Sequence, residues 1–163
     1  MNKLSATYKG LITGALMILV SLGIYFLKKD FDNALQYVTY SIYIGGILWT
    51  LFAYRQSGDE PKNFKNYFSQ GFRCFIVVTL LMVAFTWIFL KMNPGFREEM
   101  AQHYRADLES KKNYTPAEID NMVNTAKEYF VAMLTSMAIF GYLIIGALVT
   151  LIGAGFMSQK KAA

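Results

Sequence analysis

Residues 72 to 90 read FRCFIVVTLLMVAFTWIFL, and this stretch decides the fold class. It holds one charged residue, Arg73, and is close to the ~20 residues with which a helix crosses a ~30 Å hydrocarbon core. Three further apolar runs, without Asp, Glu, Lys, Arg or His, lie at residues 10 to 27, 35 to 54 and 130 to 157. The sequence therefore predicts an all-α, polytopic membrane protein with four transmembrane helices.

The composition argues against the common classes of enzyme site. Because 55% of the 163 residues are hydrophobic, we expect a single membrane domain over residues 1 to 163. Cys74 is the only cysteine and His103 the only histidine, and neither an HExxH nor a GxSxG motif is present. We therefore predict no enzymatic activity, no metal and no cofactor. The net charge of +5 indicates membrane lipids as partners, and no nucleic acid is predicted.

A polar segment precedes the fourth apolar run. Apolar residues recur every four positions from Phe96 to Leu108, and a second periodic stretch follows Thr115-Pro116-Ala117-Glu118. That tetrapeptide resembles a capping box, with Pro at the first helical position. The pattern predicts an extramembrane amphipathic helical hairpin over residues 94 to 129, whose second helix continues without a break into the fourth span.

The stretch from Pro61 to Arg73 predicts a short interfacial helix before the third span, with a bend at Gly71. Its aromatic residues share one helical face and would anchor it at the membrane surface: Phe64, Tyr67, Phe68 and Phe72. The alternative is a docking surface for a phosphate headgroup. Its donors would be Lys62, Lys65 and Arg73.

Small and hydroxyl-bearing residues suggest how the spans pack. The candidate packing positions are Gly10 and Gly14 in the first span, Ser41 and Gly45 with Gly46 and Thr50 in the second, and Gly146, Thr150 and Ala154 in the last. We favour packing within the bundle over a dedicated homodimer face. Tyr40 and Tyr43 share a face of the second span, where they form either an interfacial belt with hydroxyls bonded to neighbouring helices or a hydrated crevice for a lipid-linked substrate.

Loop charges give the orientation. Four spans place both termini and the second loop on one face, and basic residues are equally numerous on the two faces. On the first face they lie in shorter segments and nearer the helix ends, where they influence insertion most. We therefore predict cytoplasmic N- and C-termini.

The span pattern, the motif NYFSQGF at residues 66 to 72 and the helical insert before the last span together resemble DUF4199, a bacterial membrane family of unknown function common in Bacteroidota. The resemblance covers essentially the whole chain and implies a location in the bacterial inner membrane. It brings no catalytic residues. The resemblance also implies a gene that lies near those of polyprenyl-phosphate glycosyltransferases, which favours an accessory role in envelope glycan or lipid metabolism.

Two functional hypotheses follow. The first is a non-enzymatic accessory or scaffold protein that holds a membrane-protein partner, or a second copy of itself, through the 94 to 129 hairpin and the small-residue faces. The alternative is a small carrier or flippase-like protein for a lipid-linked anionic substrate, with Arg73, Lys65 and the Tyr40/Tyr43 face in the path.

Overall fold

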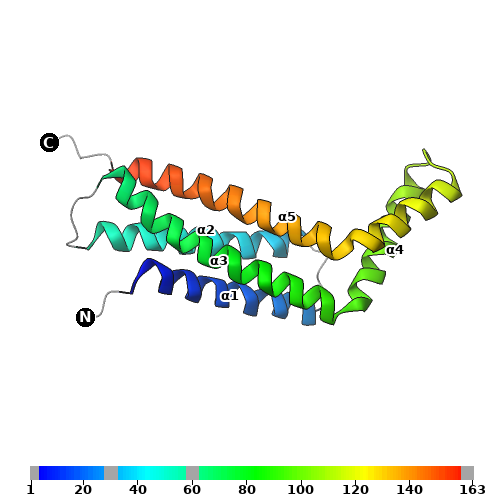
Figure 1. Ribbon diagram of the computed structural model, residues 1–163, viewed down its shortest axis with the longest axis horizontal. Helices are drawn as coiled ribbons and strands as arrows, with labels where there is room; N and C mark the ends of the chain where they lie inside the picture. The colour runs from blue at the N-terminus through cyan, green and yellow to red at the C-terminus, as the bar shows by residue number, and fades with distance from the viewer. Residues whose placement is uncertain (1–3, 28–32, 58–62, 159–163) are drawn as a thin grey trace. The chain divides into compact units, whose positions relative to one another are not determined.

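The computed structural model describes residues 4–27, 33–57 and 63–158, and within them the protein is entirely helical, as predicted. The helices are α1 (Ala6–Phe26), α2 (Asn33–Arg55), α3 (Phe64–Met92), α4 (Pro94–Ser110) and α5 (Pro116–Ser158) (Figure 1). The chain forms two compact units. Unit 1 consists of Met1–Val83 and Ile139–Ala163, and unit 2 is Ala84–Ala138.

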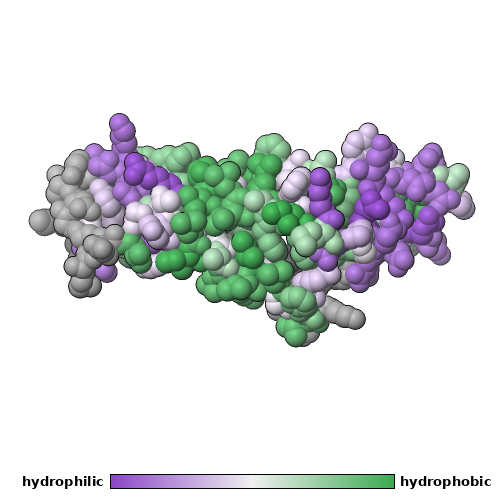
Figure 2. Space-filling view, turned by 60° about the horizontal axis from the view of Figure 1, so that its bottom comes forward, coloured by the Kyte–Doolittle hydropathy of each residue, from purple (hydrophilic) through white to green (hydrophobic). Residues whose placement is uncertain are grey.

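Among the described residues, three helices are long and apolar enough to cross a membrane, which marks a membrane protein: α1, α3 and α5. The tyrosines and the serine and threonine residues of α2 lower its mean hydropathy. By composition alone, α2 is therefore not a fourth candidate span. On the face shown in Figure 2, apolar residues cover the middle of the unit 1 bundle, and hydrophilic residues gather at the end where α1 begins.

In unit 1, α1 packs closely on α3 through two glycines. A Cβ atom at Gly10 would lie 2.7 Å from the carbonyl oxygen of Cys74, and one at Gly14 would lie 2.7 Å from Leu81 Cδ1. Such contacts let helix backbones approach, as predicted for both positions. Both glycines are buried.

The last part of α5 packs on α2 and α3 in the same way. A Cβ atom at Gly146 would meet the Tyr43 hydroxyl and lie 2.8 Å from the Phe75 ring. Thr150 and Ala154, one and two turns further along α5, are fully buried. The spacing of four residues therefore places one continuous face of α5 against the bundle.

On α2 the predicted small residues divide between an exposed and a buried face. Ser41 and Gly45 are exposed, and a Cβ atom at Gly45 would meet nothing within 4 Å. Gly46 is buried instead, and it lies directly against Thr13 of α1. Because successive helical residues differ by about 100° in direction, a shift of one position exchanges the inner face for the outer.

The predicted interfacial helix is the beginning of α3. Asn63 Oδ1 accepts a hydrogen bond from the Asn66 N–H at 3.0 Å, and the helix then runs unbroken through Gly71. A Cβ atom at Gly71 would lie 2.5 Å from Thr150 Cγ2, so this glycine permits a close helix contact and not a bend. Pro61 lies outside the described residues.

Three of the four predicted aromatic anchors line an outer side of α3. Phe64 and Phe72 are exposed and Phe68 is half-buried, and their rings succeed one another at centroid distances of 6.1 Å. Tyr67 is different because only 1% of it is exposed, and its ring meets Tyr54 edge to face at 5.0 Å. Tyr67 is therefore a core residue of unit 1.

Unit 2 contains the predicted hairpin. α4 and the first turns of α5 share a small apolar core of Ala101, Leu108, Ile119 and Val123. Ion pairs join the two helices: Arg105 with Asp120, and Lys127 with Glu98. Phe96 of α4 contacts both Phe89 and Phe130, so aromatic rings close the base of the hairpin.

The capping box and the uninterrupted helix after it are both confirmed. The Thr115 N–H donates to Glu118 Oε2 at 2.7 Å, and the Glu118 N–H donates to Thr115 Oγ1 at 3.4 Å. From Pro116 the helix continues to Ser158.

Candidate anion-binding site

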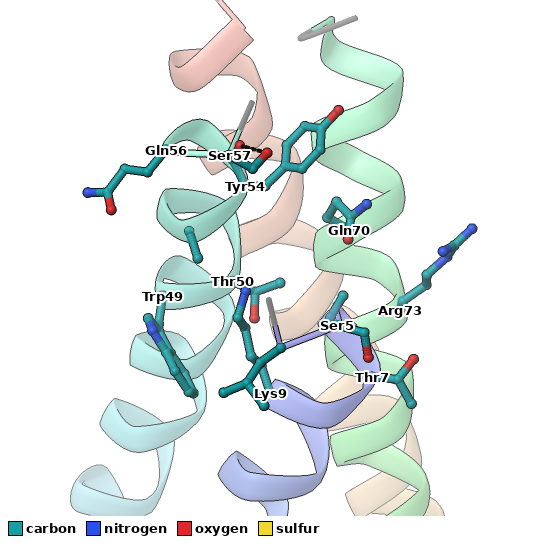
Figure 3. Close-up of a pocket in the computed structure, with 13 residues that line it drawn as sticks. Ser5, Thr7, Lys9, Trp49, Thr50, Tyr54, Gln56, Ser57, Gln70 and Arg73 are labelled. Atoms are coloured by element: carbon teal, nitrogen blue, oxygen red, sulfur yellow. Dashed lines mark hydrogen bonds between the residues drawn. The ribbon is translucent and has the colours of Figure 1, made fainter. Parts of the chain in front are cut away.

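A pocket of about 650 Å³ lies where α1 begins, α2 ends and α3 begins (Figure 3). All three segments belong to unit 1. The pocket is lined by Leu4, Ser5, Ala6, Thr7, Lys9, Trp49, Thr50, Ala53, Tyr54, Gln56, Ser57, Gln70 and Arg73.

Lys9 is the central residue of this pocket. Only 9% of its surface is exposed, and its Nζ atom lies 5.9 Å from the centroid of the Trp49 ring. In Figure 3 its side chain rises from α1 between Trp49 and Thr50. An enclosed ammonium group loses much of its hydration, and a cation–π contact of this length replaces only part of it. The site therefore favours a further, negatively charged partner.

The first turn of α1 adds backbone donors to the same pocket. Ser5 caps the helix, since its Oγ accepts a hydrogen bond from the Tyr8 N–H at 3.3 Å and its carbonyl accepts one from the Lys9 N–H. The N–H groups of Ala6 and Thr7 have no acceptor within the helix, as at any helix start. The positive end of the helix dipole also lies here, so that this turn favours anions.

The charge of the surroundings has one sign. The described residues of unit 1 include the basic side chains Lys9, Arg55, Lys65 and Arg73, and no Asp or Glu. Within those residues, then, no carboxylate can neutralise Lys9. Arg73 is exposed, and in Figure 3 its guanidinium extends away from α3 beyond Ser5 and Thr7. It adds positive charge at the rim of the pocket without contacting Lys9.

The wall opposite α1 is neutral and polar. Ser57 Oγ donates to the Tyr54 carbonyl at 2.7 Å, and Thr50 Oγ1 donates to the Gly46 carbonyl at 2.9 Å. The half-buried Gln70 amide projects from α3 toward the interior (Figure 3). This wall can donate and accept hydrogen bonds without adding charge.

The structure brings together only part of the predicted headgroup site. Arg73 lines the pocket, whereas Lys65 is exposed on α3 outside it. Lys62 lies outside the described residues. Neither Tyr40 nor Tyr43 lines the pocket.

Tyr40 and Tyr43 lie nearer the beginning of α2 than the pocket does, and both contact Tyr142 of α5. The Tyr43 hydroxyl is fully buried and donates to the Tyr142 carbonyl at 2.8 Å, and the two rings meet edge to face at 5.5 Å. The partly exposed Tyr40 ring lies 6.1 Å from that of Tyr142. The hydrogen bond of Tyr43 joins α2 to α5, as expected for a hydroxyl bonded to a neighbouring helix.

Sequence reasoning missed Lys9 and Trp49 as site residues. A partial signal was available, because Lys9 follows the cap residue Ser5 by four positions and directly precedes Gly10, which marks the α3-facing side of α1. The burial of Lys9 also depends on the approach of α2, which no local pattern encodes.

The pocket carries the groups that bind phosphate, namely an ammonium, a guanidinium, hydroxyls and free helix N–H groups. Its described lining includes no His, Cys, Asp or Glu. Elsewhere too, across the described parts of the chain, no three such residues are grouped closely enough to hold a metal ion.

Comparison with known proteins gives a family and no activity. A family model described as "Protein of unknown function (DUF4199)" matches residues 8–159. No curated protein and no solved structure matches the chain. The matched segment includes Lys9, Trp49, Gln70 and Arg73.

Proposed function

Because the chain belongs to the DUF4199 family, whose description names no function, we propose a function from the pocket: the protein binds the phosphate of an anionic lipid headgroup at the beginning of α1. On this proposal it is a non-enzymatic protein of the bacterial inner membrane that serves envelope glycan or lipid metabolism.

The observation that carries the proposal is the enclosed charge of Lys9. A lysine that extends into water needs no partner, but Lys9 is nine-tenths buried and the described residues of unit 1 supply no carboxylate. Enclosing an unpaired charge is costly, so a bound anion would stabilise this arrangement. The free N–H groups at the start of α1 would reinforce the same preference.

A lipid source for the anion is supported by the apolar border of the pocket. Trp49 and Leu4 line the pocket and are also 43% and 46% exposed, on a bundle whose helices α1 and α3 are apolar enough to cross a membrane. A headgroup could therefore enter while its chains remain beside α1 and α2. The headgroup part of the carrier hypothesis is kept, and transport along the Tyr40/Tyr43 face is not, since neither residue lines the pocket.

The proposal includes four spans and cytoplasmic termini. α2 has 23 residues, or about 35 Å at ~1.5 Å per residue, with no charge before Arg55. It packs against α1 at Gly46, beside two helices that can cross a membrane. With four spans and cytoplasmic termini the pocket lies on the cytoplasmic side, where anionic lipids attract basic residues.

The test is lipid binding to the purified full chain. Native mass spectrometry in mild detergent would measure binding of phosphatidylglycerol, with phosphatidylcholine as the zwitterionic baseline. We expect Lys9→Met to weaken phosphatidylglycerol binding by about tenfold or more, since a hydrogen-bonded charge pair is lost.

Lys65→Met is the matched control, because Lys65 is an exposed lysine of unit 1 outside the pocket. It should leave binding near the level of the unmodified chain. Equal binding by all three proteins, with unchanged helix content, would contradict the proposed site.

A scaffold role is the second candidate function. It is favoured because unit 2 is a compact unit of its own. The hairpin has its own core and interhelical ion pairs, so it could present a fixed surface to a membrane-protein partner. A stoichiometric protein that copurifies from native membranes, and that is lost when Leu108→Asp disrupts the hairpin core, would support this role. If no such protein copurifies with the unmodified chain, the scaffold role is contradicted.

A further inference from the structure

The neutral wall of the pocket bears on which headgroup fits. Gln70 is half-buried and projects into the pocket, and its side-chain amide forms no hydrogen bond with any other described residue. A primary amide has two donor hydrogens and an acceptor oxygen, which together complement a hydroxyl group. Lys9, by contrast, has three donors, a positive charge and no acceptor.

The lining also discriminates against a second charged group on the ligand. An ethanolamine headgroup brings a second positive charge, and the described lining has no carboxylate to pair with it. Trp49 and Tyr54 are the aromatic residues of the lining, and Lys9 already lies over the Trp49 ring. An ammonium placed over Trp49 would therefore lie close to Lys9 and be repelled.

The size of the pocket points beyond phosphate. At about 650 Å³ it is far larger than a phosphate group, which takes the room of only a few water molecules of ~30 Å³ each. The remaining volume, in a pocket that Gln70 also lines, is enough for a small hydroxylated group.

We infer that the ligand is a phosphodiester lipid with an uncharged polyol headgroup, whose phosphate binds at Lys9 and the start of α1 while its hydroxyls bond to Gln70. This inference rests on the proposed function and adds the ligand class. Lys9 provides the affinity for the anion, and Gln70 provides the selectivity between anions.

The experiment compares phosphatidylglycerol, phosphatidic acid and phosphatidylethanolamine on the full chain by native mass spectrometry. We expect Gln70→Leu to lower the ratio of phosphatidylglycerol to phosphatidic acid binding by about fivefold, as for the loss of one or two neutral hydrogen bonds. Gln102→Leu is the control, since Gln102 is an exposed glutamine of α4 in unit 2. It should leave the ratio unchanged.

The outcomes separate the two proposals. A ratio that Gln70→Leu leaves unchanged, with binding still dependent on Lys9, would overturn the polyol assignment and leave the anion site standing. Tighter binding of phosphatidylethanolamine than of phosphatidylglycerol would also overturn it. Equal competition by soluble glycerol 3-phosphate would instead contradict the lipid source, and binding independent of Lys9 would contradict the anion site itself.

Discussion

At the scale of single residues, two lysines of unit 1 differ in burial, and we expect them to differ in role for that reason. Lys9 and Lys65 each lie near the beginning of a helix, but Lys9 is 9% exposed and Lys65 extends from the surface of α3. A surface cation contributes little beyond solubility and attraction to lipid. An enclosed cation requires a partner, and for this reason we expect Lys9, and not Lys65, to bind the anion.

Glu118 offers a prediction on the pH dependence of the hairpin. Hydrogen bonds from the Thr115 N–H and hydroxyl hold the pKa of Glu118 below its ordinary value of about 4.3. The folded state therefore binds a proton less readily than the unfolded state. The stabilisation by Glu118 is fully present above that ordinary value and is lost as the pH falls through the lowered pKa.

Hydrogen–deuterium exchange of the amides from Ile119 to Val123 would measure this effect in the full chain. We expect Glu118→Gln to speed exchange at pH 7 and to remove part of the acid dependence. Glu128→Gln is the matched control, as Glu128 forms no ion pair or hydrogen bond with a described side chain. If both variants exchange alike across the pH range, the capping box does not hold the start of α5.

At the scale of helices, the sequence predicted what local chemistry determines. The start of α5 is set by Thr115, Pro116 and Glu118, which lie next to one another, so the helix and its unbroken course were both predictable. The role of Gly71 was not, because it depends on Thr150, which is distant in sequence. The same limit applies to α2, where Ser41, Gly45 and Gly46 were all predicted packing positions and only the approach of α1 shows that Gly46 is the one in close contact.

Gly10 gives a prediction for the contact between α1 and α3. A methyl group there would lie 2.7 Å from the Cys74 carbonyl oxygen, and a backbone atom cannot easily move aside. We expect Gly10→Ala to destabilise unit 1 by about 1–3 kcal/mol through overpacking, less the gain of up to about 1 kcal/mol in helix propensity. Thermal unfolding in detergent would measure the difference.

Gly45→Ala isolates the packing contribution, because it brings the same gain in helix propensity at a position where the added methyl group meets nothing within 4 Å. It should leave the midpoint of thermal unfolding unchanged or raise it. A midpoint for Gly10→Ala equal to that for Gly45→Ala would show that α1 and α3 are not in close contact there.

At the scale of the whole molecule, the number of spans determines which segments share a side of the membrane. If α2 crosses, Asn63 lies on the same side as the N-terminus and Ser110 of the hairpin lies opposite. If α2 does not cross and the N-terminus remains cytoplasmic, α3 and α5 each cross the membrane in the opposite direction. Asn63 then lies on the outer side and Ser110 on the cytoplasmic side. The crossing of α2 therefore decides the location of both the pocket and the hairpin.

Single cysteines at Asn2, Asn63 and Ser110, in a Cys74→Ser background, can measure these sides with a membrane-impermeant maleimide on cells whose outer membrane is permeabilised. With four spans and cytoplasmic termini, we expect Ser110→Cys to be labelled in intact cells, and Asn2→Cys and Asn63→Cys only after lysis. Labelling of Asn63→Cys but not of Ser110→Cys or Asn2→Cys in intact cells would mean that α2 does not cross. Labelling of both Asn2→Cys and Asn63→Cys in intact cells would instead mean that the bundle has the opposite orientation. The Lys9 pocket would then lie away from the anionic lipids of the cytoplasmic leaflet, and its ligand would have to be a headgroup of the outer leaflet.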